Sequence, residues 1–200
     1  MATSRQERSA ETERALKDAA QRLFAERGYL NTKITDITAA AGRAAGSFYN
    51  HFASKEELLQ ALLRDLADAG DVRAEHPDHN PDFSDPSAVR YHIAGYWHFA
   101  REHASVLRAV GQAAAVNEDF ARLLQQFGVE QRADIADHLK GLVDNGFRLP
   151  STPDASLAVM FIATQGLLAA VEDGAVELSD EQAIDGLTRF VYRGLTGRDY

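Results

Sequence analysis

The apolar residues of this chain recur with helical spacing almost from end to end. Near the N-terminus they form one stripe, and Gly28 follows it at a position suited to ending a helix. The sequence contains neither a repeat nor the alternation of apolar and polar residues that is typical of a strand. The pattern therefore predicts an all-α protein. The residues of the first stripe are Leu16, Ala19, Ala20, Leu23 and Phe24.

Two short helices joined by a turn are predicted after this first helix. Thr32 is placed to cap the first of them, and Asp36 falls in its first turn, where the helix dipole favours a carboxylate. Gly42 can adopt the left-handed conformation that ends a helix. Phe48 and Phe52, four positions apart, give the second helix an apolar face to pack on the first. The arrangement is that of a helix-turn-helix.

The face of the second helix opposite the two phenylalanines favours contact with DNA. It combines small, hydroxylated, aromatic and amide side chains, from Gly46, Ser47, Tyr49 and Asn50, and contains no carboxylate. Such a surface can enter a major groove without repelling the phosphates, as the second helix of a helix-turn-helix must. The segment thus predicts a DNA-binding motif.

Capping residues and a loop indicate the next helices. The segment Ser54–Glu57 has the pattern of a capping box and opens a leucine-rich helix that runs to about Gly70. The loop that follows is rich in Pro, Asp and Asn and is the best candidate for a domain boundary. Asp85 and Pro86, a cap residue before a proline, restart the helical pattern. Two helices are expected to fill residues 86–115.

Three more helices are expected in the remainder of the chain. Asn117 can cap one long helix that continues to about Asn145. Thr152, followed by a proline, opens the next helix. Ser179 begins a second capping box, which opens the final helix.

Residues Ala155 to Val171 form the longest run without a charge. Because a membrane-spanning helix needs about 20 residues, we expect no membrane contact. A helix that is apolar on every face must be covered all round, so we expect a second copy of the chain to cover one side of it. The alternative is that this helix and the final one fill a large monomer core. The residues predicted at the dimer interface are Ala163, Gly166, Ala170, Ile184, Leu187, Val191 and Leu195.

Charge is unevenly distributed along the chain. Residues 1–55 carry nine Lys and Arg against six Asp and Glu, a net charge of +3, whereas the remaining residues have a net charge of −12. We therefore divide the chain into a DNA-binding domain, residues 1–55, and a ligand-binding and dimerisation domain, residues 56–200. The absence of cysteine excludes disulfides and thiolate sites, and the polar N-terminus has no signal-peptide core. We expect a cytoplasmic protein.

Over about residues 8–66 the sequence resembles the DNA-binding domain of the TetR family of transcriptional repressors. The resemblance rests on an aromatic residue after Gly28, on Thr32 before an Ile-Thr-Asp-Ile run, on Gly42 at the turn and on the Gly-Ser-Phe-Tyr run that begins at Gly46. It implies an N-terminal three-helix DNA-binding domain and a C-terminal helical domain for ligand binding and dimerisation. In that family, a small molecule bound in the C-terminal domain changes the separation of the two DNA-reading domains of the dimer.

The resemblance also implies which residues contact DNA. Tyr49, His51 and Lys55 would hold backbone phosphates, and Lys33 and Thr35 would lie near a phosphate or a base edge. For Tyr49, His51 and Lys55 the alternative is a packed or solvated side chain without a DNA contact. The full predicted set is Lys33, Thr35, Arg43, Gly46, Ser47, Tyr49, Asn50, His51 and Lys55, in which Ser47 and Asn50 are the candidates for base contact.

Three positions depart from the family's pattern. Arg43 replaces a branched apolar residue, Ala44 replaces a serine that caps the helix, and Ala45 replaces a longer polar side chain. Loss of the cap should cost about 1 kcal/mol, and base readout is expected to give way to phosphate contacts and DNA shape. Arg43 is expected either to contact a phosphate or to lie over the turn. Arg5 and Arg8 are expected in a disordered tail, with a minor-groove arm as the alternative.

An aromatic and histidine-rich run over residues 91–103 indicates a ligand pocket in the second domain, with plain core packing as the alternative for each member. Gln165 is a polar side chain in an uncharged helix and needs a partner if it is buried. Asp134 and His138 have a spacing that metal ligands can have, but a surface ion pair is expected and no metal is predicted. The predicted pocket residues are Tyr96, Trp97, Phe99, His103, Phe120, Phe127, Phe161 and Gln165.

Taken together, these features predict a homodimeric, ligand-responsive transcriptional regulator. It would be a repressor that a small apolar effector releases from a palindromic operator in double-stranded DNA. Neither enzymatic activity nor a cofactor is expected, because the sequence lacks a serine elbow, a phosphate-binding glycine loop and a metal-spaced His/Glu motif. The alternatives are a helical architectural DNA-binding protein without an effector, or a helical protein that binds a small molecule as an enzyme or carrier.

Overall fold

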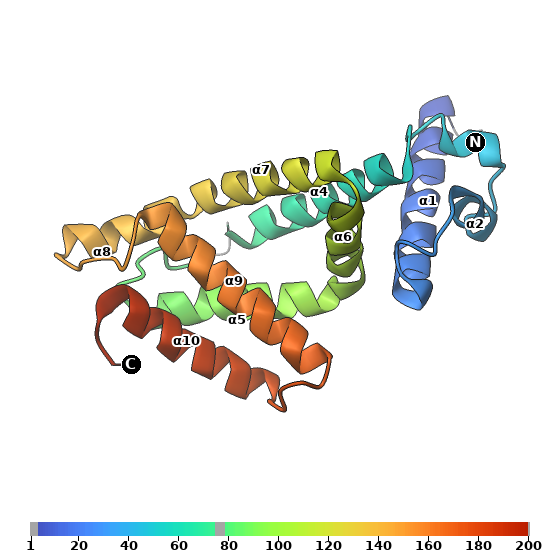
Figure 1. Cartoon of the computed structure of the whole chain (residues 1–200). Helices are drawn as coiled ribbons and strands as arrows, with labels where there is room; N and C mark the ends of the chain where they lie inside the picture. Colours follow the sequence, from blue (N-terminus) through green and yellow to red (C-terminus); the bar gives the residue numbers. More distant parts are fainter. Residues whose placement is uncertain (1–3, 75–78, 200) are drawn as a thin grey trace. The chain divides into compact units, whose positions relative to one another are not determined.

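The computed structural model describes residues 4–74 and 79–199, and every regular element within those ranges is a helix. This confirms the predicted all-α fold. In chain order (Figure 1) the elements are α1 (Arg5–Arg27), α2 (Ile34–Ala40), α3 (Ala45–Phe48), α4 (Lys55–Ala74), α5 (Pro86–Glu102), α6 (Ala104–Val116), α7 (Glu118–Asp134), the 3₁₀ helix η1 (Ala136–Leu139), α8 (Lys140–Asp144), α9 (Pro153–Glu172) and α10 (Asp180–Thr196).

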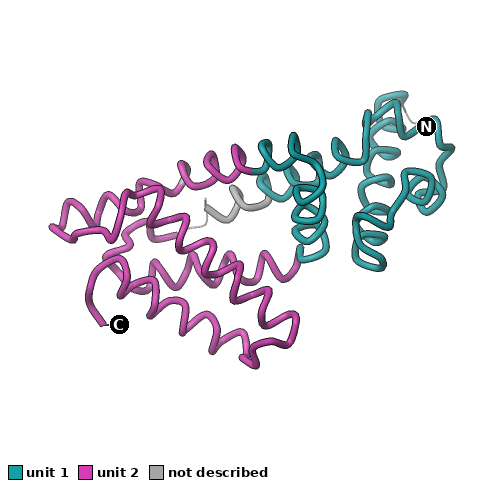
Figure 2. Tube along the Cα trace, in the orientation of Figure 1, with its two compact units in different colours: residues 1–72, 103–124 teal, residues 73–102, 125–200 magenta. Residues whose placement is uncertain are grey.

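The chain forms two compact units, each of which combines two stretches of sequence (Figure 2). Unit 1 comprises Met1–Val72 and His103–Leu124, and unit 2 comprises Arg73–Glu102 and Gln125–Tyr200. The boundary that the charge distribution predicts after residue 55 lies inside unit 1, and the functional division into residues 1–55 and 56–200 stays a prediction.

Unit 1 is built on the stripe predicted for the first helix, whose five residues are all buried in α1. Gly28 follows α1 with a φ of 78°, as expected of a glycine that ends a helix. Helices α2 and α3 pack on each other through residues that include Ile37 and Phe48, both fully buried. Helix α6 packs on α1, and there the backbone N–H of Tyr29 donates to Oε1 of Gln112 at 2.8 Å.

In unit 2, helices α5, α9 and α10 lie side by side (Figure 1). Their core includes Trp97 of α5, which has no exposed surface. Both predicted helix starts are confirmed, since Thr152 Oγ1 accepts a hydrogen bond from the N–H of Ala155 at 3.3 Å and Ser179 forms a complete capping box with Gln182. These side-chain caps satisfy N–H groups that the helix itself leaves unpaired.

Two details at the N-terminal end correct the prediction. Arg5 and Arg8 do not belong to a disordered tail, because a capping box between Ser4 and Glu7 starts α1 at Arg5. Thr32 does not cap α2; its hydroxyl donates to the carbonyl of Gly28 at 2.8 Å, and Lys33 is the N-cap residue.

The start of α4 follows its prediction in part. The N–H of Glu57 donates to Ser54 Oγ at 3.2 Å, as in a capping box, but the Glu57 carboxylate accepts from the N–H of Ala53 rather than from that of Ser54. The helix extends to Ala74, beyond the predicted end near Gly70.

The single long helix predicted from Asn117 to about Asn145 is wrong. Asn117 caps α7 as expected, with Oδ1 accepting from the N–H of Phe120 at 3.0 Å, but α7 ends at Asp134. A 3₁₀ turn follows, in which His138 is buried and its carbonyl accepts a 3.4 Å hydrogen bond from the N–H of Phe83. Residues 134–140 contain no glycine or proline that would end α7. The helix ends instead at this 3₁₀ turn, which meets the distant segment that carries Phe83.

Helix α9 is long and apolar enough to cross a membrane, by length and composition alone. The shorter uncharged run in the sequence had led to the opposite expectation, but the helix also includes Asp154 and Glu172. In the structure α9 packs on α5 and α10 and buries a polar residue, Thr164, whose hydroxyl donates to the carbonyl of Met160. The chain itself covers one face of α9 and leaves Val159 and Ile162 on the other face exposed.

Candidate DNA-binding surface and ligand cavity

The segment that follows Gly42 presents the predicted DNA-binding side chains on a turn that is fixed from behind. Phe48 and Phe52 are buried with ring centroids 5.7 Å apart, and the N–H of Phe52 donates to the carbonyl of Phe48 at 2.9 Å. On the other side Tyr49 is 62% exposed, and its ring meets that of Phe48 edge-on. Gly46 and Asn50 are exposed as well. The predicted division of this segment into a packed face and a free face is confirmed.

Helix α3 is shorter than the sequence suggests, with only four residues before a turn continues the chain to His51. Ala44 provides no side-chain cap, as its replacement of a serine predicts. The Ser47 hydroxyl donates to the carbonyl of Ala44 at 2.6 Å, so its hydrogen is engaged within the turn. A helix this short contributes little stability of its own, so the burial of Phe48 and Phe52 is what holds this segment in place.

The basic side chains around this turn are in different environments. Lys33 is exposed, together with Thr35, at the start of α2. Arg43 is half-buried and pairs with Glu11 of α1 at 3.0 Å. His51 is also half-buried, and its Nδ1 lies 3.9 Å from a carboxylate oxygen of Glu13. Helix α1 thus supplies acidic partners to two of the residues assigned to DNA.

Lys55 holds two segments of unit 1 together. Its ammonium donates to the backbone carbonyls of Tyr29 and Thr32 at 2.8 and 2.9 Å, and lies 3.9 Å from the centroid of the Tyr29 ring. Two of the three ammonium hydrogens therefore satisfy carbonyls of the loop before α2. These contacts contradict the alternative of a freely solvated Lys55. That its third ammonium hydrogen contacts a DNA phosphate stays a prediction.

A neighbouring carboxylate completes this arrangement. The buried Tyr29 hydroxyl donates to Glu56 Oε1 at 2.6 Å. Burial alone would raise the pKa of Glu56, but hydrogen bonds from Tyr29, the backbone and Ser54 lower it below its usual value. Burial lowers the pKa of Lys55, an effect that the Glu56 charge opposes. The start of α4 is thereby fixed to the start of the helix-turn-helix.

A cavity of about 140 Å³ lies among α5, the turn after α7, and α9 in unit 2. Of the eight predicted pocket residues, Tyr96 and Phe161 line it, and their rings meet edge-on at 5.4 Å. Gln165 is exposed and does not line the cavity. Its amide donates to the hydroxyl of Tyr96, a lining residue, at 2.7 Å and so helps to position that ring. The complete lining is His92, Ile93, Tyr96, Ile135, Met160, Phe161 and Thr164.

The other five predicted pocket residues do not line this cavity. Trp97 is fully buried in the core of unit 2, and Phe120 is buried in unit 1. His103 also belongs to unit 1, while Phe99 and Phe127 are half-buried outside the lining. The aromatic run covers several faces of α5, and composition alone does not distinguish the face that meets the cavity from the one that meets the core.

Titratable groups at the cavity are strongly affected by burial. Burial lowers the pKa of His92 to about 4, and the hydrogen bond from its ring to the carbonyl of Ala88 opposes this only in part. Burial also raises the pKa of Tyr96, although the hydrogen bond that its hydroxyl accepts from Gln165 lowers that pKa in part. At neutral pH the cavity wall thus carries a neutral imidazole and a neutral phenol.

The surface predicted for dimerisation divides into buried and exposed parts. The α10 stripe of Ile184, Leu187, Val191 and Leu195 is buried within the chain itself, which corrects its assignment to an interface. On α9, Gly166 is exposed, and Ala163 and Ala170 are half-buried. The large apolar side chains that these two helices leave exposed are Val159 at 60%, Ile162 at 68% and Phe190 at 66%.

Sequence comparison finds a family match in unit 1. Residues 16–62 match the model for bacterial regulatory proteins of the TetR family. The HTH-type transcriptional repressor KstR2 of Mycobacterium tuberculosis is 49% identical over 53 residues, which are 26% of each chain. The HTH-type transcriptional regulator TtgR of Pseudomonas putida is 42% identical over 65 residues, 32% of this chain and 31% of that one. The chain thus matches less than a third of the length of these curated relatives.

Comparison with solved structures extends the likeness of fold to most of the chain. A TetR-like transcriptional regulator from Rhodococcus sp. RHA1 matches with a TM-score of 0.67 and 21% identity, over 92% of this chain and 94% of the other. A Saccharomonospora viridis protein, described as a transcriptional regulator and solved in complex with choline, matches with a TM-score of 0.73 and 22% identity, over 94% and 100%. The fold and the helix-turn-helix match agree with the expectation of a protein that is not an enzyme. Residues 16–62 thus match the DNA-binding part of the TetR family of bacterial regulatory proteins, and the fold of the chain is similar to that of TetR-like regulators.

Proposed function

We propose that the chain is a dimeric, DNA-binding transcriptional repressor that acts in the cytoplasm and leaves its operator when a small apolar molecule occupies unit 2. The observation that carries the DNA-binding part is the turn after Gly42. Its free face presents Gly46, Tyr49 and Asn50, while Phe48 and Phe52 fix it from behind. An aromatic hydroxyl and an amide on a rigid, carboxylate-free turn suit contact with phosphates and base edges.

The cavity in unit 2 supports an effector of small size. Its walls are mainly apolar and aromatic, with Thr164 and the neutral ring of His92 as polar groups. The volume of about 140 Å³ is below the usual range of about 300–1,000 Å³ for ligand pockets. We therefore propose an effector of few heavy atoms, whose binding weakens DNA binding by a coupling free energy on the order of 1–3 kcal/mol.

Selection from a random DNA pool tests this function directly. The full chain is expected to recover a short palindrome and to bind it with strong salt dependence. Small apolar compounds, with choline as one further probe, are then screened for release of that DNA. Equal binding of palindromic and scrambled sequences would instead favour an architectural DNA-binding protein, and failure to bind any DNA would favour a protein that binds small molecules only.

The substitution Asn50→Ala tests base reading. Asn50 is exposed on the turn, and an asparagine amide matches adenine through two hydrogen bonds, which are worth about 1–3 kcal/mol of discrimination. Binding should weaken most at operators that carry the recognised base and little at the others. Tyr49→Phe is the control, because loss of a phosphate contact should weaken all operators alike. An equal loss on every operator for Asn50→Ala would contradict base reading.

The substitution Lys55→Met separates two roles of one side chain. It removes the ammonium from the carbonyls of Tyr29 and Thr32, so the free energy of unfolding should fall by about 1–3 kcal/mol in chemical denaturation. If the third hydrogen also holds a phosphate, the slope of log affinity against log salt should decrease by about one per lost contact.

Lys33→Met is the matched control for Lys55, since Lys33 is exposed at the start of α2. Its loss should change the salt slope without a comparable loss of stability. A destabilised Lys55→Met protein with an unchanged salt slope would remove Lys55 from the phosphate contacts and leave it a structural role.

A further inference from the structure

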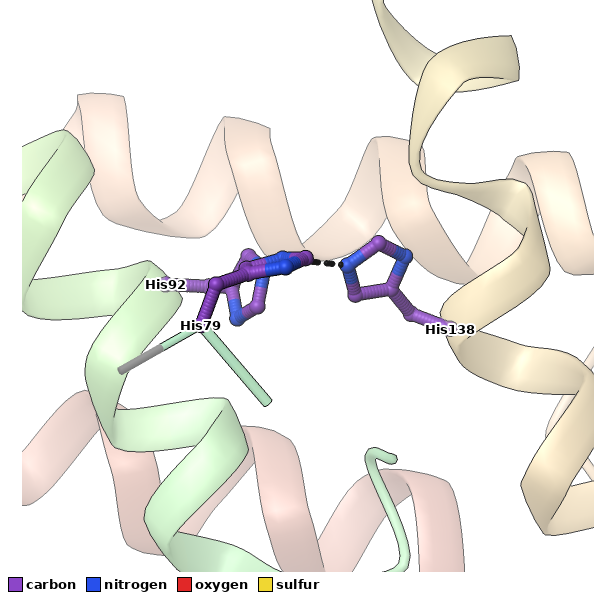
Figure 3. A group of neighbouring side chains, drawn as sticks. All are labelled: His79, His92 and His138. Atoms are coloured by element: carbon purple, nitrogen blue, oxygen red, sulfur yellow. Dashed lines mark hydrogen bonds between the residues drawn. The ribbon is translucent and has the colours of Figure 1, made fainter. Parts of the chain in front are cut away.

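Three histidines from distant parts of the sequence converge in unit 2. His79 precedes α5, His92 lies on α5, and His138 lies on the 3₁₀ helix η1 (Figure 3). Nε2 of His79 lies 3.1 Å from Nε2 of His92 and 2.9 Å from Nε2 of His138. One ring nitrogen from each residue lies within 4.8 Å of the other two. The sequence did not predict this cluster, because nothing pointed to His79, His92 was only part of the aromatic run over residues 91–103, and His138 was expected to pair with Asp134.

The backbone does not place His138 where the predicted ion pair with Asp134 requires it. Helix α7 ends at Asp134 and His138 belongs to the next element, so the two residues do not lie four apart on one continuous helix. The side chain of Asp134 lies outside the described residues. His138 instead faces histidines contributed by two earlier segments of the chain.

Hydrogen bonding among neutral rings does not account for the cluster. Nδ1 of His92 lies 2.8 Å from the carbonyl of Ala88, so this nitrogen carries the proton and Nε2 presents a lone pair. Nε2 of His79 has at most one hydrogen for two short contacts. If His138 donates to His79 instead, the contact between His79 and His92 brings two lone pairs together. In either case one contact lacks a good hydrogen bond.

A cation between the three nitrogens would satisfy all of them, and we propose that His79, His92 and His138 bind a divalent transition-metal ion. The two separations from His79 Nε2, 3.1 and 2.9 Å, suit this, because metal–nitrogen bonds of about 2.0–2.1 Å place the ligand nitrogens of a tetrahedral ion roughly 3.3 Å apart, and all three ligand nitrogens lie within 4.8 Å of one another. Among the described residues the donor set consists of imidazoles alone. Neutral imidazoles favour Zn²⁺ and its neighbours Co²⁺, Ni²⁺ and Cu²⁺ over Mg²⁺ or Ca²⁺.

The surroundings hold these rings in position. The Ala88 carbonyl orients His92, as second partners orient metal-binding histidines. The fully buried ring of Phe83 meets His92 at 4.9 Å and His138 at 5.3 Å, edge-on in both cases. The hydrogen bond from the N–H of Phe83 to the carbonyl of His138 ties the backbone of η1 to the segment that carries His79. The Phe83 ring thus covers one side of the cluster with apolar surface.

Three protein ligands leave a coordination position open on a tetrahedral ion. His92 belongs both to the cluster and to the lining of the cavity. A bound ion would therefore lie next to the cavity, where water or a donor atom of a bound molecule can complete its coordination. The metal site does not depend on the proposed DNA-binding function, and its test needs no DNA.

Metal binding by the full chain provides that test. Protein freed of its purification tag and of metal by chelation is titrated with Zn²⁺ in a calorimeter, and with Co²⁺ while the visible absorbance is recorded. One ion per chain is expected, together with a Co²⁺ spectrum of low coordination number and a higher melting temperature. Failure of the wild-type chain to bind one ion of Zn²⁺, Co²⁺, Ni²⁺ or Cu²⁺ would overturn the proposal.

Single substitutions assign the ligands. His79→Gln, His92→Gln and His138→Gln should each weaken Zn²⁺ binding more than about 100-fold, since even loss of a second partner of a ligand costs 10–100-fold. His98→Gln is the matched control, because His98 is exposed on the same helix as His92, and it should bind like the wild type. Because His79 lies before α5 and outside any helix, His79→Gln is the substitution least expected to disturb folding. Circular dichroism checks that the variant is folded. Unchanged binding by His79→Gln would contradict the site.

Discussion

The substitution Ile162→Glu is expected to convert the proposed dimer into a monomer. Ile162 is 68% exposed on α9, on the same unit as the exposed Val159 and Phe190. A glutamate at an apolar interface must lose its hydration without gaining a partner, which costs several kcal/mol. The molecular mass in sedimentation should therefore fall to that of one chain. Affinity for a palindrome should decrease by about 100-fold or more, because the two half-sites are no longer bound by linked modules.

Val129→Glu is the matched control for this experiment. Val129 is 54% exposed on α7, a different helix from those that carry Val159, Ile162 and Phe190, so Val129→Glu is expected to add the same charge without a change of oligomeric state. Affinity for a single half-site should be nearly unchanged in Ile162→Glu. If Ile162→Glu remains a dimer, this face of α9 is not the interface, and Leu187 and its neighbours remain what the structure shows them to be, core residues.

The second large effect is expected from Phe48→Ala, which should unfold the DNA-binding turn. Phe48 is fully buried, and truncation of a buried phenylalanine to alanine costs about 3–5 kcal/mol. The free energy of unfolding of a whole domain is only about 5–15 kcal/mol. Because α3 has four residues and no side-chain cap, little else holds this segment. Specific DNA binding should be lost.

The only tryptophan of the chain makes this loss easy to locate. Trp97 is buried in unit 2, so its fluorescence reports unfolding of that unit, whereas far-ultraviolet circular dichroism reports both units. In urea, Phe48→Ala should lose part of its helical signal before the fluorescence changes. Tyr49→Ala, at an exposed neighbour, should weaken DNA binding with little effect on either transition. Equal destabilisation by both variants would contradict the division into a packed and a free face.

The sequence predicted best those features that depend on neighbouring residues. The start of α10 is an example, since Ser179 and Gln182 satisfy each other's backbone N–H groups within one turn. Gly28 and Gly42 end their helices for a similarly local reason, with φ of 78° and 64°. Where a distant segment decided the outcome, as at the break after α7, the local pattern gave no indication of it.

Periodicity identified apolar faces but not what covers them. The stripe of α10 that contains Leu187 and Val191 was assigned to a partner chain, yet it packs inside its own unit. Spacing along one helix cannot distinguish these outcomes, since burial against the same chain and against a second copy require the same residues. The exposed Phe190, on the other side of α10, became informative only once the packing was known.

Side chains with several possible partners were the hardest to predict. Lys55 has the charge expected of a phosphate contact, but two of its hydrogens bind carbonyls more than twenty positions earlier in the chain. The meeting of His79 with His138 joins positions 59 residues apart. Chemistry and local spacing suggest what a residue can bind, whereas the fold decides which partner it reaches first.

The ion pair between Arg43 and Glu11 affects how this surface would respond to salt. When a free arginine meets DNA, a condensed cation leaves the phosphate and enters solution, and that release is the source of the salt dependence of binding. Arg43 already has a counterion, and Glu11 is part of the same chain. To reach a phosphate Arg43 must leave a carboxylate that cannot diffuse away and that then repels the DNA. If the chain binds DNA as proposed, Glu11 would act as a tethered competitor of the phosphate for Arg43, and it would suppress binding to non-specific sites more than binding to an operator that offers other contacts.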